Sequence, residues 1–158
     1  MKIEICVTRT IAAAPAAVFA LALDAQRFPA VFAGCGPVPA LRRITTHGAP
    51  AVGNMREVTS SDGSQLIERI TIFDPPQRHA YTLSNLRPPL AWLVSTGDAD
   101  WTFADADGAT RVNWRYAFNL TSALAWPLAA PLLRVFMRAA MRRCLGAMAR
   151  LLETNGAA

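Results

Sequence analysis

The sequence predicts an α+β fold in which one antiparallel β-sheet packs against a single long helix near the C-terminus. Between residues 40 and 119, short segments of alternating polar and apolar residues are separated by turn residues, which is typical of a β-meander. Residues 121–153 instead carry apolar side chains at helical spacing. The 158 residues contain no internal repeat or linker. We therefore expect one domain over residues 1–158, with disorder only at 154–158.

The first forty residues predict one strand followed by two short helices. Polar and apolar residues alternate over 2–12, as in a half-buried strand. Pro15 occupies a favourable first helical position, so a helix is expected over 16–23. Asp24 can cap a second helix over 25–32, which the glycines and proline that follow would end.

The middle of the chain predicts a curved sheet of about six or seven strands in all. Asp62-Gly63 and Asp107-Gly108 are typical hairpin turns. A sheet of this size cannot stay flat, because neighbouring strands twist relative to one another. Residues 92–96 fit either a short strand or a loop. The other expected strands are 40–46, 54–60, 65–73, 79–84, 100–104 and 111–119.

The long terminal helix is amphipathic. Pro127 and Pro131 favour a kinked approach segment, with regular helix starting near Pro131. Arg134, Arg138 and Arg142 recur every four residues on one face, which is either solvated or docks to anionic lipid headgroups or an acidic partner. The opposite face should pack on the sheet through Leu133, Phe136, Met137, Ala140, Cys144, Ala147, Met148 and Leu151.

Composition argues against several classes of function. The net charge is +5, but the arginines are scattered outside the terminal helix, so no nucleic-acid partner is expected. The three cysteines are odd in number and far apart, which favours small buried thiols in a reducing cytoplasm. The apolar runs at 11–23 and 120–133 are too short to span a bilayer.

The sequence predicts neither a metal centre nor a cofactor. His47 and His79 have no partner at a metal-ligand spacing. His47 is expected to be solvated, and His79, at a strand start, is expected to be exposed or to lie at a packing edge. Gly34-Cys35-Gly36-Pro37 does not open a helix as a phosphate-binding loop does.

Three segments resemble those of a known superfamily. They are TIAAAPAAVF at 10–19, ERITIFDPP at 68–76 with Tyr81 beyond it, and GATRVNW at 108–114. With the order of elements, they make the whole chain similar to the START-like (SRPBCC) polyketide cyclase/dehydrase superfamily, which has the helix-grip fold. The resemblance implies a deep apolar cavity for a lipid, sterol, polyketide or other hydrophobic ligand. These segments mark the fold and carry no catalytic signature.

Strand alternation indicates one polar group inside such a cavity. On the strand over 65–73, Leu66, Glu68, Ile70 and Ile72 share a face, so Glu68 is expected to point inward. Arg56 lies across the Asp62-Gly63 turn, nearly in register with Glu68. The pair would serve as a polar anchor or an acid/base, or form a structural or surface ion pair; a slip of one residue would place Glu57 there instead.

Aromatic residues complete the candidate ligand site. Those on the inner strand faces would suit a flat or ring-shaped ligand, although core packing explains them equally well. Trp92 lies beside the Pro88-Pro89 loop and is a candidate for the cavity mouth. The full set of expected ligand-binding residues is Arg56, Glu68, Tyr81, Trp92, Trp101, Phe103, Trp114, Tyr116, Phe136 and Ala140.

Three functions stay open. The favoured one is binding or transport of a hydrophobic molecule. The second is a cofactor-free cyclase, dehydratase or hydrolase, with Glu68 as the acid/base and Tyr81 as an oxyanion donor. The third is an interaction module that docks a protein or a membrane surface through the arginine face of the terminal helix. The sequence does not specify the ligand or the oligomeric state.

Overall fold

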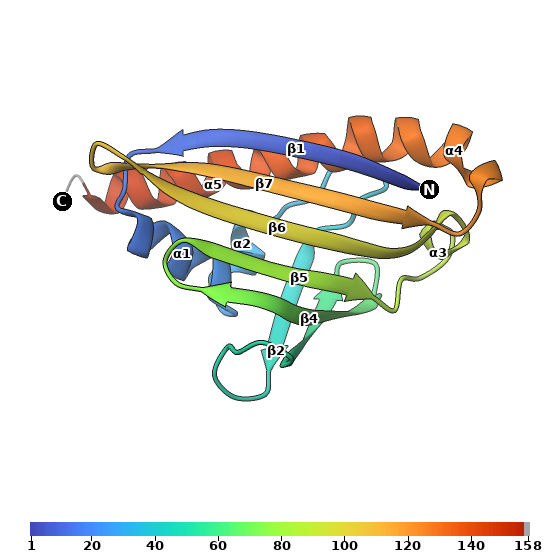
Figure 1. Ribbon diagram of the computed structural model, residues 1–158, viewed down its shortest axis with the longest axis horizontal. Helices are drawn as coiled ribbons and strands as arrows, with labels where there is room; N and C mark the ends of the chain where they lie inside the picture. The colour runs from blue at the N-terminus through green and yellow to red at the C-terminus, as the bar shows by residue number, and fades with distance from the viewer. Residues whose placement is uncertain (157–158) are drawn as a thin grey trace.

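The computed structural model describes residues 1–156 and contains one seven-stranded antiparallel sheet, in the order β1-β7-β6-β5-β4-β3-β2. The sheet curves along the helix that ends the chain, as Figure 1 shows. This is the α+β helix-grip arrangement that the sequence predicts. The strands are β1 Lys2–Ile11, β2 Leu41–Thr46, β3 Met55–Ser60, β4 Gln65–Asp74, β5 Arg78–Ser84, β6 Val94–Ala106 and β7 Ala109–Leu120.

Both predicted hairpins are confirmed. β6 and β7 are joined through Asp107 and Gly108, whose φ angles of 56° and 85° fit the tight turn that Asp-Gly favours. β3 and β4 pair across the Asp62-Gly63 turn. Residues 92–96 are divided, because the helical turn α3 (Leu90–Leu93) ends where β6 begins. β6 is therefore much longer than the predicted strand over 100–104.

The two short helices of the opening are present. α1 runs over Pro15–Leu23 and α2 over Phe28–Val31. Asp24 caps the turn between them, since its Oδ1 accepts the backbone N–H groups of Gln26 and Arg27 at 2.9 and 3.0 Å. α2 is shorter at both ends than the predicted helix over 25–32.

The terminal helix covers nearly the range 121–153 that the sequence predicts. It runs from Ala123 to Gly156 through η1 (Ala123–Ala125), α4 (Trp126–Pro131), the π-helical turns η2 (Leu132–Met137) and α5 (Arg138–Gly156). The predicted start near Pro131 is therefore wrong. Wide π turns follow directly after this proline, which cannot donate a backbone hydrogen bond. Disorder was expected at 154–158, but 154–156 are helical, and 157–158 lie outside the described residues.

The apolar face of this helix is buried against β1, α1 and α2. The sequence missed Met141 and Leu145, which are both buried, whereas Phe136 is 36% exposed. By length and composition alone, the helix over Ala123–Gly156 is apolar enough to cross a membrane. Burial of Ala140, Met141 and Cys144 in the core shows that α5 packs within the domain.

A β-bulge changes which side chains face inward at the end of β4. The register with β5 shifts between Ile70 and Ile72, so that Phe73 pairs with His79. Phe73 packs against Phe19 on the inner side of the sheet, with ring centroids 6.0 Å apart. The prediction that Ile72 shares the face of Glu68 therefore fails beyond Ile70, because a bulge reverses the alternation.

The cysteines are free thiols, but only Cys144 is buried as expected. Burial raises the pKa of the Cys144 thiol. Cys6 is exposed and donates to Oδ1 of Asn113 at 2.7 Å. The cytoplasmic location inferred from cysteine usage stays a prediction.

The loop between α2 and β2 should not tolerate a side chain at Gly34. A Cβ there would lie 2.3 Å from the carbonyl oxygen of Val38, and Gly34 has a φ of 72°. Gly48 has a φ of 90° but open space around it, so it is a matched control. We expect Gly48→Ala to cost about 1–2 kcal/mol for its backbone conformation. Gly34→Ala should cost roughly 1–3 kcal/mol more through overpacking. Urea unfolding of both variants measures the difference, and equal losses would contradict it.

Candidate functional site

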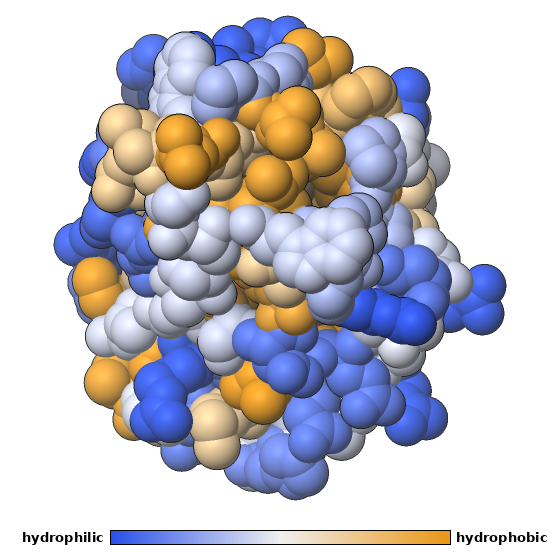
Figure 2. Space-filling model, turned by 90° about the vertical axis from the view of Figure 1, so that its right-hand side faces the viewer, coloured by the Kyte–Doolittle hydropathy of each residue, from blue (hydrophilic) through white to orange (hydrophobic). Residues whose placement is uncertain are grey.

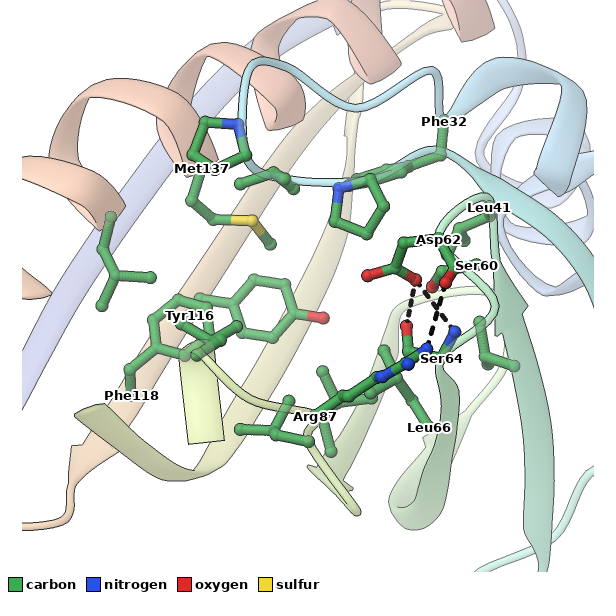
Figure 3. A pocket seen from close by; sticks show the side chains of 18 of the residues that line it. Phe32, Leu41, Ser60, Asp62, Ser64, Leu66, Arg87, Tyr116, Phe118 and Met137 are labelled. Carbon is green, nitrogen blue, oxygen red and sulfur yellow. Dashed lines mark hydrogen bonds between the residues drawn. The ribbon is translucent and has the colours of Figure 1, made fainter. Parts of the chain in front are cut away.

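A cavity of about 220 Å³ lies between the sheet and the first half of the terminal helix. Leu132, Leu133 and Met137 form its helical wall. The inner faces of β3, β4, β5 and β7 form the opposite wall, and the loops after α2 and β5 close the sides. Figure 3 shows Met137 and Phe118 at one side of the cavity and the polar side chains of the β3–β4 turn at the other.

The floor of the cavity is aromatic. Trp114, Tyr116 and Phe118 alternate along β7, and Tyr81 reaches in from β5. The hydroxyl groups of Tyr81 and Tyr116 are 2.9 Å apart and hydrogen-bonded. Burial raises the pKa of both phenols, with the charge of Glu68 adding to the effect, so both stay neutral. The floor thus offers flat apolar surfaces and one pair of hydroxyl groups.

A buried ion pair lies in the wall beside this floor. Arg56 and Glu68 are direct partners in the β3–β4 ladder, as the sequence predicts. Oε2 of Glu68 accepts from Nε of Arg56 at 3.0 Å and from Nη2 at 2.5 Å. Both side chains are under 10% exposed, and Glu68 lines the cavity while Arg56 does not. Nη1 of Arg56 also donates to the Leu23 carbonyl at 3.4 Å, which links the pair to the end of α1.

His79 lies near this pair in a dry environment. It is 1% exposed, and neither ring nitrogen has a hydrogen-bond partner among residues 1–156. Of the two expectations for His79, exposure is therefore wrong, because its ring is buried. Burial, reinforced by the nearby charge of Arg56, lowers the pKa of His79 to about 4. The imidazole is thus neutral at pH 7.

The side of the cavity formed by the β3–β4 turn is polar. Oδ1 of Asp62 accepts the backbone N–H of Ser64 at 2.9 Å and its hydroxyl at 2.6 Å, and these bonds lower the pKa of Asp62. Nη1 of Arg87 donates to the backbone carbonyl of Asp62 at 3.2 Å. This contact ties the loop after β5 to the β3–β4 turn, as Figure 3 shows. Ser60 lies just below, with a buried hydroxyl that has no partner within the described chain.

Four of the predicted ligand-binding residues line this cavity, namely Glu68, Tyr81, Trp114 and Tyr116. The other six do not line it.

Three of these six lie in the core. Trp101 stacks on Trp114 with ring centroids 3.9 Å apart, and Phe103 packs edge-on against Phe19 at 5.3 Å. Ala140 is completely buried in the helix–sheet interface. A ligand in the cavity would reach Trp101 only through Trp114.

The remaining three lie around the cavity. Arg56 stands behind Glu68. Phe136 lies over Gly36, where an added Cβ would meet its ring at 2.6 Å. Trp92 is 71% exposed on α3, between Leu90 and Leu93, which both line the cavity.

Sequence reasoning missed the polar rim and most of the loop walls. Ser60 could have been found, because it continues the alternation of Arg56 and Val58 along β3. Asp62 and Arg87 lie in turns, where no periodicity indicates direction. Phe28 at the start of α2, and Phe32 and Pro37–Pro39 in the loop after it, join the wall only because of the path that this segment takes in the folded chain.

This arrangement can bind an apolar molecule and hydrogen-bond one polar group. Within residues 1–156, no three His, Cys, Asp or Glu side chains are placed to share a metal ion. The polar groups on residues that line the cavity include Glu68, Tyr81 and Tyr116, together with the Ser60 hydroxyl and the Trp114 indole N–H, which have no hydrogen-bond partner within residues 1–156.

The fold and its cavity define a helix-grip protein, and its family is shown by similarity to known proteins. The chain belongs to the family described as polyketide cyclase/dehydrase and lipid transport, whose model matches residues 2–153. No curated protein matches the chain.

Several solved structures share the fold. One is the di-domain ARO/CYC protein StfQ of the steffimycin biosynthetic pathway, with a TM-score of 0.76 and 15% identity over 100% of this chain and 53% of that one. Another is norcoclaurine synthase from Thalictrum flavum, at 0.71 and 12% over 96% and 93% of the two chains. A third is TTHA0849 from Thermus thermophilus, at 0.71 and 16% over 97% and 99%. At these identities the likeness concerns the fold alone.

The buried His79 should make the protein less stable in mild acid. In the unfolded chain a histidine has a pKa near 6.5, whereas the folded value is about 4. The unfolded state therefore binds a proton first as the pH falls from 6.5 to 4, and stability decreases through this window, by up to roughly 3 kcal/mol. Above pH 6.5 this contribution is fully present. Urea unfolding across this range should show a smaller pH dependence for His79→Leu than for the natural protein.

The exposed His47 provides the control for this measurement. His47→Gln should keep the full pH dependence. A His79→Leu variant that loses stability with acid as steeply as the natural protein would contradict the assignment.

Proposed function

We propose that the protein binds, and carries or presents, a hydrophobic small molecule in the cavity between the sheet and the terminal helix. The observation that supports this is a cavity with a mainly apolar lining and a few polar groups at defined positions, which is the usual composition of a ligand site. Its volume of about 220 Å³ exceeds the roughly 150 Å³ of an engineered apolar cavity that takes up benzene.

The lining indicates the kind of ligand. Trp114, Tyr116 and Phe118 present ring faces, which favour a flat aromatic or polyketide-like body, and the leucines around them suit an acyl chain equally. Glu68 and the hydroxyl pair of Tyr81 and Tyr116 would hydrogen-bond one polar group of such a ligand. We infer a mostly apolar ligand, a lipid, polyketide or aromatic, with a polar group at its inner end.

Filling the cavity should abolish binding. Val58 is 1% exposed and lines the cavity, so Val58→Phe would place a ring inside it. Val52→Phe is the matched control, because Val52 is 64% exposed on a loop. Native mass spectrometry of freshly purified protein should show an apolar ligand that is retained by Val52→Phe and lost from Val58→Phe.

A second measurement uses fluorescence. Trp114 lines the cavity, so titration with apolar aromatic or acyl probes should change the tryptophan emission, and Trp114→Phe should remove most of that change. The proposal would be refuted if native mass spectrometry found no ligand on the natural protein and if no probe changed its tryptophan emission. Equal binding by Val58→Phe would also refute it.

An enzyme is the second candidate, because a carboxylate and two phenols meet in one cavity wall. Glu68 would act as the acid/base, and Tyr81 would donate to a developing oxyanion, in a cyclisation or dehydration without a cofactor. The ion pair weakens this candidate, since Arg56 already engages Glu68 through two hydrogen bonds. Binding is therefore the leading proposal.

Glu68→Gln separates binding from catalysis. If Glu68 transfers a proton, turnover of a polyketide-like substrate should fall by about a hundredfold or more, while ligand affinity changes little. Losing one partner of a buried pair can cost roughly 3–5 kcal/mol, so circular dichroism must confirm folding. Arg56→Met with Glu68→Gln removes both charges and provides a second background. Full activity in either variant would reject the role of Glu68.

A further inference from the structure

We propose that the end of the molecule around the cavity mouth docks onto the surface of an anionic lipid bilayer. The docking surface is an apolar rim, which we define as Trp92, Leu124, Trp126, Leu128 and Val135. This goes beyond ligand binding, because it concerns the outside of the protein and would operate with an empty cavity.

The side chains of the rim are large, apolar and exposed to solvent. Leu124 is 90% exposed, Trp92 71% and Leu128 67%. Trp126 and Val135 are 40% and 58% exposed. Figure 2 views this end of the molecule, and hydrophobic surface gathers over the upper half of it. Clustered apolar side chains of this size mark interaction sites in proteins that otherwise keep charged surfaces.

Two distant parts of the chain build the rim as one surface. The hydroxyl of Thr121 donates to the Trp92 carbonyl at 2.7 Å, and its N–H donates to the Leu93 carbonyl at 3.0 Å. These bonds hold α3 against the start of the terminal helix. Leu124 and Leu128 lie four residues apart at the start of the terminal helix, Val135 lies in the π turns that follow, and all three are exposed.

Three segments that contribute to the cavity wall carry no charge. Residues 28–41, 88–97 and 116–133 contain no Asp, Glu, Lys, Arg or His. Each of these three segments contributes residues to the cavity wall, including Pro37, Leu90 and Leu132. The charged residues at the cavity mouth are instead Asp62 and Arg87, which come from the β3–β4 turn and the loop after β5.

Arginines flank the rim. Arg134 places its guanidinium 5.6 Å from the ring centroid of Trp126, and Arg87 is exposed beside the mouth. Two carboxylates lie toward this end: Asp98 forms an ion pair with Lys2 at 3.9 Å, and Asp62 accepts hydrogen bonds from Ser64 and Arg87 through its side chain and its backbone carbonyl, respectively. Indole rings beside arginines suit the headgroup region of a bilayer. Tryptophan favours the membrane–water interface, and arginine is attracted to anionic headgroups. A twofold dimer through this surface would bring the arginine borders of two copies together, which favours the bilayer as the occupant.

The rim borders the cavity, so docking would bring the mouth to the membrane. Leu132 lines the cavity and lies between Leu128 and Val135 on the helix, and Leu90 and Leu93 line it on either side of Trp92. An apolar ligand could pass between bilayer and cavity with little exposure to water. This contact differs from docking through Arg138 and Arg142, which lie farther along the helix.

Vesicle binding tests the proposal without any ligand. The natural protein should co-sediment with phosphatidylcholine–phosphatidylglycerol vesicles and bind less to phosphatidylcholine alone. Leu124→Glu with Leu128→Glu should lower the partition coefficient by at least about tenfold. Both leucines would be buried in the membrane on docking, and the substitutions remove that favourable burial. Arg134→Gln should weaken binding to anionic vesicles only.

Val52→Glu with Met55→Glu is the matched control. Both residues are exposed, at 64% and 45%, and they lie on β3 and the loop before it, outside the rim. This variant should bind vesicles as the natural protein does. Circular dichroism and ligand retention should be normal in both double variants, which separates this proposal from ligand binding.

Three results would overturn the proposal. One is a natural protein that binds neither kind of vesicle. The second is an equal loss of binding in the control variant. The third is a dimer, seen by light scattering, that Leu124→Glu with Leu128→Glu dissociates while vesicles capture no protein; the rim would then be a contact between copies of this chain.

Discussion

The structure depends on a mismatch of width between one helix and the sheet that it covers. Seven strands spaced by about 4.8 Å span about 29 Å, whereas a helix with its side chains is only about 10–12 Å wide. The helix packs over β1, beside α1 and α2, and cannot also reach β3 and β4. Loops and the short helix α2 must close the remaining inner face. Because these loops do not fill the space as a second helix would, a cavity remains.

The same mismatch explains the polar groups inside. β3 and β4 lie far from the helix, so their inward side chains need not pack tightly against apolar neighbours. Arg56 and Glu68 occupy this region and satisfy one another, which a buried pair must do to avoid a large desolvation cost. His79 is buried without a hydrogen-bond partner among residues 1–156, and burial lowers its pKa, so the ring stays neutral at pH 7. The buried hydroxyl groups of Tyr81 and Tyr116 hydrogen-bond to each other, which avoids the cost of leaving a buried polar group without a partner.

Much of the fold could be predicted because its signals are local. Alternation located β1 and β4, the Asp-Gly pairs located two hairpins, and the pairing of Arg56 with Glu68 followed from counting across one of them. Predictions failed where tertiary packing overrides local pattern. The bulge at Ile70–Ile72 turned Phe73 inward. The helix continued through Pro131, and His79 proved buried although it begins a strand.

The sequence by itself determined the α+β class, the inward position of Glu68 and an aromatic inner face, because strand periodicity fixes which side chains share a face. Only the tertiary structure decided which aromatic residues reach a ligand. Trp114 lines the cavity while Trp101, on the same face one strand away, lies beneath it, because β7 borders the open space and β6 is covered. It also decided that charge-free segments from three parts of the chain line one cavity, since only the folded chain brings them together.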